Sequence, residues 1–206
     1  MIFGLFLTAL GIVMTIKANV GYAPWEVFHV GLSNTIGLSF GMTTILVGII
    51  LVVIVTLLGE KMGFGTIISM ILTGLFADIM LISHLIPVVE NFLVGVLMLV
   101  AGLFIISLGT YFYIKTAFGV WPRDNLMVVL ARKTKYPVGV CRFSVEFSIT
   151  FIGWLLGGMV GIGTIISVIV IGFCIQITFG LLKFDVTAVK HESFGDTIDL
   201  FSDKKK

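Results

Sequence analysis

The chain has 206 residues, of which 58% are hydrophobic and 12% are charged, whereas an ordinary soluble domain has roughly 45–50% apolar and about 25% charged residues. With a mean hydropathy of +1.18, it has too little polar surface to cover a globule in water, so we predict an all-α polytopic membrane protein. A net charge of +2, with no basic strip of interleaved aromatic residues, gives no indication of a nucleic-acid partner.

Six stretches are predicted to be transmembrane helices, because a bilayer crossing needs about 20 mostly apolar residues. The first could be mistaken for a signal peptide, but no basic region precedes Ile2 and no small-residue cleavage site interrupts the run to Lys17. We therefore expect a retained first span. The six spans cover residues 1–18, 40–58, 64–85, 92–114, 138–157 and 162–182.

Two further segments, 24–36 and 122–133, are too short to cross a bilayer alone. Each begins at a proline, which favours the first turn of a helix. Each also carries an acid two residues later, Glu26 and Asp124, which suits a helix N-terminus. The sequence predicts two short helices that lie on the membrane or dip into it.

The chain matches itself without a gap when it is shifted by 98 residues, which predicts two copies of one unit. We expect repeat 1 over 1–90, repeat 2 over 91–183 and a polar, cytoplasmic tail over 184–206. The matching positions include Ile16-Lys17 with Ile114-Lys115, Gly21 with Gly119, Pro24 with Pro122, Gly41 with Gly139, and 63–69 with 161–167.

Positive charge orients the predicted helices, because lysine and arginine concentrate on the cytoplasmic side. With six crossings and both termini in the cytoplasm, only Lys17 of the 13 lysines and arginines faces outward. Three crossings per copy make the second copy inverted relative to the first, a 3+3 repeat. If the short helices crossed fully, each copy would have four crossings, the repeat would be parallel, and Lys61 and Lys115 would also face outward.

The loop and short helix of each copy form the strongest candidate site. Glycine and proline interrupt the apolar run at matching places, which is tolerated at membrane depth only inside protein or beside water. A helix that begins there directs free backbone N–H groups at a ligand. The alternative is a simple turn, with Trp25 and Trp121 as interface anchors. The candidate substrate-binding residues are Lys17, Asn19, Pro24, Trp25, Glu26, Lys115, Pro122, Arg123 and Asp124.

Ionisable residues within spans are candidates by default, because charge inside a bilayer is expensive. Asp78 matches Gln176 in the second copy, so both are added to the candidate site, and we expect them to meet the short helices in a polar cavity. Asp78 is interpreted either as a buried, hydrogen-bonded acid or as a proton- or cation-coupling group. Arg142 and Glu146 are spaced for an ion pair one helical turn apart.

Other chemistry is not indicated. His29 and His84 lack the spacing of metal ligands, and Cys141 and Cys174 lie in apolar segments without a paired motif. No nucleophile and base can be assembled into an active site, and no cofactor motif is present. We therefore predict neither a metal site, nor a cofactor, nor an enzyme.

The stretch Gly21–Glu26, its duplicate Gly119–Asp124 and the two Gly-Thr-Ile-Ile-Ser segments resemble the YczE/YyaS/YitT family of bacterial integral membrane proteins. The resemblance covers about 1–183 and implies a small, multi-pass protein of the bacterial inner membrane, with no chemistry to carry over. The predicted function is transport of a small anionic or zwitterionic solute at a site between the repeats. The alternative is a non-transporting membrane scaffold or assembly partner.

Overall fold

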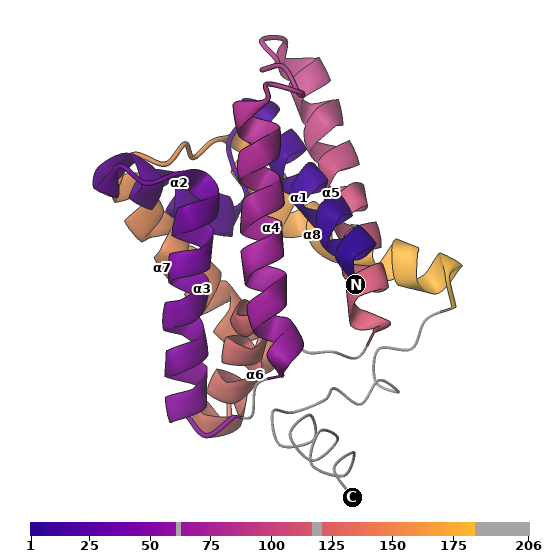
Figure 1. The fold of residues 1–206 in the computed structure, drawn as a ribbon. Coiled ribbons are helices and arrows are strands. Elements are labelled where there is room, and N and C mark those ends of the chain that lie inside the picture. Colours follow the sequence, from indigo (N-terminus) through magenta and orange to yellow (C-terminus); the bar gives the residue numbers. More distant parts are fainter. Residues whose placement is uncertain (61–62, 117–120, 184–206) are drawn as a thin grey trace, which may run out of the picture.

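A computed structural model of the protein describes residues 1–60, 63–116 and 121–183 (Figure 1). These residues form helices and no strand, which confirms the all-helical prediction, and every predicted segment matches a helix to within one turn at either end. The predicted tail, 184–206, lies outside the described residues. The helices are α1 (Ile2–Lys17), α2 (Pro24–Ile36), α3 (Phe40–Leu57), α4 (Phe64–Ile82), α5 (Phe92–Ile114), α6 (Pro122–Thr134), α7 (Val138–Leu155) and α8 (Ile162–Leu181).

The ends of the helices follow from local chemistry. α2 and α6 each start at a proline, whose fixed φ suits the first turn. α3 starts after Ser39, whose hydroxyl accepts a hydrogen bond from the Met42 backbone N–H at 3.1 Å. α2 ends at Gly37, where the backbone turns left-handed with φ of 71°. These signals divide a nearly continuous apolar sequence into separate helices.

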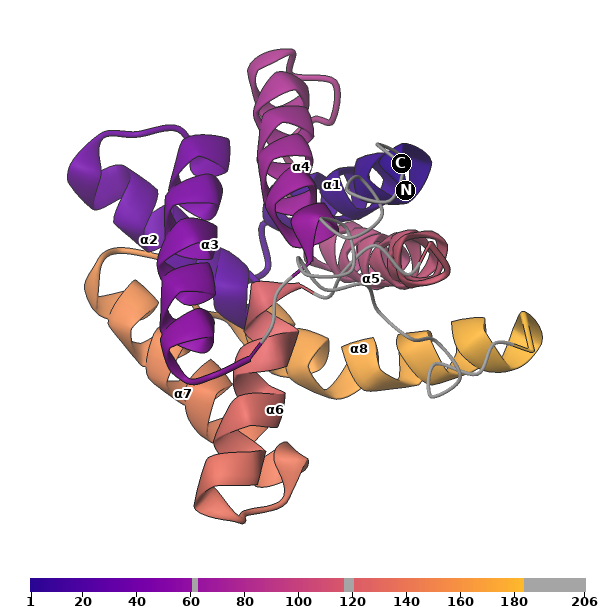
Figure 2. The same cartoon turned by 60° about the horizontal axis from the view of Figure 1, so that its bottom comes forward.

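The helices pack in two groups of four. α1, α4, α5 and α8 form one group, in which α1 packs against α4 and α5, and α5 also packs against α8. α2, α3, α6 and α7 form the other group, in which α2 and α6 each pack against both α3 and α7, and α3 also packs closely against α4 of the first group. Figure 2 shows the two groups side by side. Each group contains helices that match at the shift of 98 residues: α1 with α5 and α4 with α8 in the first group, and α2 with α6 and α3 with α7 in the second.

Among the described helices, α1 and α5 form the most extensive contact, and glycines lie in it. A Cβ added at Gly11 would lie 2.6 Å from the carbonyl oxygen of Gly102, and one at Gly4 would lie 2.8 Å from that of Gly109. Only glycine allows two helix backbones to approach so closely. The pairing runs antiparallel, and Gly4 and Gly11 are the counterparts of Gly102 and Gly109 at the shift of 98 residues.

The structure contains the helices of a membrane protein. α3, α5, α8 and residues 65–82 of α4 are each long and apolar enough to cross a bilayer, and α1 is a shorter apolar helix. Large apolar side chains remain exposed along these helices, as at Ile49 and Leu97. Such surface is stable where lipid covers it.

Candidate functional site

Both short helices enter the bundle by their N-terminal ends. In α2, Trp25 and Glu26 are each 5% exposed, whereas Ile36 at the other end is 42% exposed. In α6, Pro122 is buried and the last turn, from Arg132, is exposed. The free N–H groups and partial positive charge of each first turn therefore point into the protein interior.

A cavity of about 60 Å³ lies where these two helices begin. Four ionisable side chains line it: Glu26 from α2, Arg123 from α6, and Arg142 and Glu146 from α7. The fold therefore brings two acidic and two basic side chains from three helices around one interior space. The remaining lining residues are Ala23, Pro24, Trp25, Leu103, Ile106, Met127, Ser167, Val168 and Ile171.

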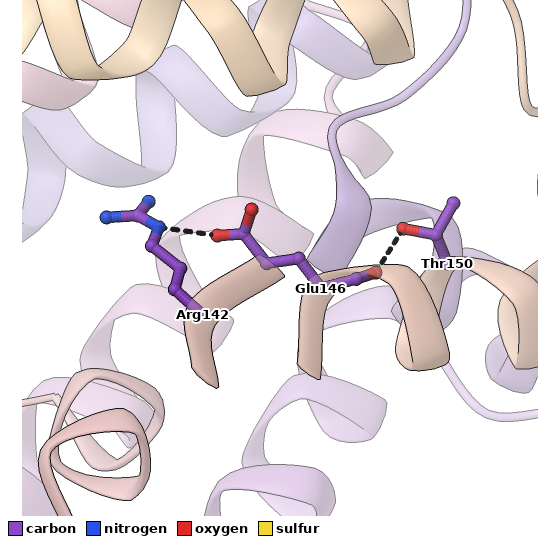
Figure 3. A network of polar contacts seen from close by, with 3 residues as sticks. All are labelled: Arg142, Glu146 and Thr150. Atoms are coloured by element: carbon purple, nitrogen blue, oxygen red, sulfur yellow. Dashed lines mark hydrogen bonds and ion pairs between the residues drawn. The ribbon is translucent and has the colours of Figure 1, made fainter. Parts of the chain in front are cut away.

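The charges in this cavity differ in how they are paired. Arg142 Nε donates a hydrogen bond to Glu146 Oε1 at 2.9 Å, and Thr150 Oγ1 donates to the Glu146 carbonyl oxygen at 2.6 Å (Figure 3). Among the described residues, no ion pair within 4.0 Å includes Glu26. The Arg123 guanidinium carbon lies 5.0 Å from the centre of the Trp121 ring. One acid and one base in the cavity thus remain without a direct ionic partner there.

A second cavity of about 30 Å³ borders the starts of α2 and α6 from the other side. Trp25 and Arg123 line both cavities, and here they meet residues of α3 and α4. Three lining residues, Thr44, Gly48 and Met70, are the counterparts of Arg142, Glu146 and Val168 in the first cavity. The two cavities are therefore equivalent places in the two copies, one with an ion pair and one without.

An open groove of about 310 Å³ runs between α7 and α8 and meets the charged cavity. Pro24, Glu146 and Val168 line both spaces. Apolar side chains form most of the groove walls, including Phe143 and Phe147 of α7. The charged cavity thus has a wide lateral opening on this side.

Asp78 and Gln176 lie away from the charged cavity, which differs from the expectation. Asp78 Oδ1 accepts a hydrogen bond from the Gly41 backbone N–H at 2.7 Å, and its Oδ2 accepts one from the Ser39 hydroxyl. Asp78 therefore caps the start of α3 from α4, because the free N–H groups there attract an acid. Gln176 is exposed on α8.

The flanking candidates also lie outside the cavity. The Lys17 carbonyl accepts a hydrogen bond from Val89 N–H at 3.0 Å, and Asn19 turns the chain with φ of 55°. Lys115 Nζ donates to the Tyr111 hydroxyl at 3.4 Å. The side chain of Asp124 is not among the described ones. Of the candidate substrate-binding residues, Pro24, Trp25, Glu26 and Arg123 line the charged cavity, and Pro122 lines the smaller one.

Sequence reasoning placed Arg142 and Glu146 in an ion pair but did not place them in the site. The available signal was their position in the repeat, since they stand where the first copy has Thr44 and Gly48. A pair of charges that replaces a threonine and a glycine within a predicted span is a candidate for function by default. Within the described residues, no group of three histidines, cysteines or acids could hold a metal ion.

The fold and the cavity define a multi-pass, all-helical membrane protein. Residues 1–179 match the family of unknown function DUF6198, and the chain belongs to this family. It is 30% identical to the uncharacterized membrane protein YczE of Bacillus subtilis over 175 residues, 84% of this chain and 80% of YczE. It is 29% identical to the uncharacterized protein YyaS of the same organism, over 87% of this chain and 90% of YyaS.

An uncharacterized protein of Haemophilus influenzae is 28% identical over 88% of this chain and 83% of its own length. The predicted relationship to YczE and YyaS is therefore confirmed. No solved structure matches the chain.

Proposed function

We propose that the protein transports a small zwitterionic solute across the bacterial inner membrane, with its substrate site in the charged cavity. The observation that carries the proposal is the set of four ionisable side chains that α2, α6 and α7 contribute to one interior space. Charged groups at membrane depth typically mark solute or ion pathways. Interrupted helices whose N-termini meet in the middle of a bundle are a recurring form of transport site.

The proposal includes six crossings, both termini in the cytoplasm, and two inverted repeats. The α1–α5 contact supports the inversion, because Gly4 meets Gly109 while their counterparts Gly102 and Gly11 meet each other. Such a reciprocal, antiparallel contact is the property of a two-fold axis perpendicular to both helices. If α1 and α5 cross the bilayer, that axis lies in the membrane plane.

The substrate class follows from the balance of charges. With its acids and bases ionised, the cavity is neutral overall, so a solute with one positive and one negative group fits better than a simple anion. Glu26 can receive the cationic group, because no ion pair among the described residues occupies it. Arg123, held over the Trp121 ring, can receive the anionic group.

Proteoliposomes test this proposal. Purified protein is reconstituted and screened for uptake of labelled amino acids and betaines as zwitterionic probes. We expect uptake of at least one probe, and at least a tenfold loss of uptake in Glu26→Gln and Arg123→Gln. Lys133→Gln is the control, because it removes a charge from the exposed end of α6. Failure of every probe, or unchanged uptake in both cavity variants, would overturn the proposal.

A second function, a non-transporting scaffold, is favoured by one other feature. α7 exposes a row of aromatic side chains, in which the Phe143 and Phe147 rings stack with centres 6.1 Å apart. Phe151 and Trp154 continue the row. Exposed aromatic rows serve as anchors for a partner helix. The scaffold function predicts a membrane partner whose co-purification is lost in Phe147→Ala and retained in Glu26→Gln.

A further inference from the structure

α3 and α4 pack directly against each other along a line of contact that we call the α3–α4 seam, and this seam is closed. A Cβ added at Gly74 would lie 2.7 Å from the Gly41 carbonyl oxygen, and one at Gly41 would overlap the Gly74 carbonyl. Asp78 stabilises this contact, because its carboxylate accepts hydrogen bonds from the Gly41 backbone N–H and the Ser39 hydroxyl. Two helix backbones therefore touch at the end of the hairpin far from the connecting loop.

The counterpart seam, between α7 and α8, is open. Its matching glycines are Gly139 and Gly172, at the same shift of 98 residues. Within the described part of the chain, a Cβ added at either would meet no atom within 4 Å. Gln176, the counterpart of Asp78, is exposed there. Figure 2 shows α8 running away from α7, whereas α3 and α4 pack against each other.

A glycine inside a helix destabilises it by roughly 1 kcal/mol relative to alanine. At Gly41 and Gly74 the close helix contact explains the residue. At Gly139 and Gly172 the present arrangement gives no such reason, although both stand in the register that closes the first seam. A second arrangement, in which α7 and α8 touch, would supply the reason.

We propose that the α3–α4 and α7–α8 seams are the two gates of the cavity, and that the second closes by contact of Gly139 with Gly172. The cavity beside the closed seam has about 30 Å³, and the one beside the open seam has about 60 Å³. The groove between α7 and α8 reaches Glu146 from the side, and its lining extends toward Val160 in the α7–α8 connection, so the proposed gate at Gly139 and Gly172 lies beyond the groove's other end.

The gates lie at opposite membrane faces in the proposed topology. α3 begins at the outer face, so the Gly41–Gly74 contact closes the cavity to the outside. α7 begins at the cytoplasmic face, so the gap between Gly139 and Gly172 opens it to the cytoplasm. The structure thus has the arrangement of an inward-open state, and closing one seam while opening the other gives the outward-open state.

Cross-linking in native membranes tests the gate without a transport assay. The native cysteines are removed by Cys141→Ala and Cys174→Ala, and the pair Gly139→Cys and Gly172→Cys is introduced. The membranes are then oxidised and treated with a maleimide polymer, which labels free thiols only, so loss of labelling reports a disulfide. A disulfide requires Cα atoms roughly 4.4–6.8 Å apart, so the pair reacts only if the seam closes. The control pairs Gly172→Cys with Ser144→Cys, which lies about 140° away on α7 at 3.6 residues per turn.

We expect the Gly139 and Gly172 pair to lose at least half of its labelling and the control pair to keep it. Equal labelling of the two pairs would overturn the gate. This inference takes its biological meaning from the proposed transport function, but the two can fail separately. A cross-link without uptake of any probe would support the gate proposal and overturn the transport proposal. Uptake without a cross-link would overturn the gate proposal alone.

A substitution at Gly172 gives a second test. A Cβ added at Gly172 meets no atom within 4 Å among the described residues, and leucine is a better helix former than glycine, so purified Gly172→Leu protein should be at least as stable as the wild type. The leucine side chain prevents close contact of α7 with α8, so uptake should fall at least tenfold. Uptake at the wild-type rate in a stable Gly172→Leu protein would contradict closure at this seam.

Discussion

The two hairpins α3–α4 and α7–α8 match in sequence register but differ in structure. Both carry a glycine at each of the two positions where the helices could touch, but only Gly41 and Gly74 are in contact. The closed hairpin borders a small cavity with Thr44 and Gly48, and the open one borders a larger cavity with an ion pair. The comparison teaches that glycines at matching sequence positions can be packed in one hairpin and unpacked in the other.

The largest expected effect concerns the glycines of the closed seam. Gly74→Leu should destabilise the protein by about 1–3 kcal/mol or prevent folding, because the side chain must enter the backbone contact with Gly41. Its counterpart Gly172→Leu should not destabilise the protein, and replacing a helical glycine at this open position should stabilise it by up to about 1 kcal/mol. Unfolding in detergent measures both. Equal destabilisation would show that the second seam is also closed in solution.

The second-largest effect is expected for the ion pair between Arg142 and Glu146 of α7, beside the open α7–α8 seam. Arg142→Gln and Glu146→Gln should each lower the free energy of unfolding by about 1–2 kcal/mol, because each leaves a charge without its hydrogen-bond partner, although the 44% exposure of the Arg142 side chain limits the loss. The double variant should recover part of this loss. At the closed seam, Thr44→Val is the matched substitution, and we expect a smaller loss there because no charge is left unpaired. Additive losses for Arg142 and Glu146 would mean that the pair is not coupled.

Removing the hydrogen bonds that Ser39 and Asp78 make at the closed α3–α4 seam should have a moderate effect. Ser39→Ala removes the cap of α3 and should lower stability by about 0.5–2 kcal/mol. Asp78→Asn should weaken the same seam and increase the reactivity of a cysteine placed at Met42, on the exposed side of α3. Gln176→Ala should leave stability unchanged. Loss of stability in Gln176→Ala would place that residue in a contact that the open seam lacks.

The smallest effect is expected at the loop of the closed hairpin. Glu60 forms an ion pair with Arg132 of α6, whereas their counterparts, Gly158 and Asn34, cannot. The Arg132 side chain is 68% exposed, so Arg132→Ala should lower stability by no more than about 1 kcal/mol. Salt should reduce this difference. A larger, salt-independent loss would indicate that the loop helps to hold the seam closed.

Helix positions could be predicted from the sequence because their signals are local. The apolar lengths, the prolines at 24 and 122 and the spacing of Arg142 and Glu146 all act within one helix. The partners of Asp78 could not be predicted, because Ser39 and Gly41 lie on another helix. The difference between the seams could not be predicted either, since both carry the same glycines and their state depends on the packing of the whole bundle.

Distances between spin labels at matched positions test the central claim most directly, namely that the two seams are in opposite states. One pair is Met42→Cys with Leu75→Cys, and its counterpart is Val140→Cys with Phe173→Cys; all four positions are exposed, and the native cysteines are replaced. In reconstituted membranes, the account predicts a shorter main distance for the first pair and a longer one for the second, each with a minor population at the other's value. Identical single distances for both pairs would contradict it.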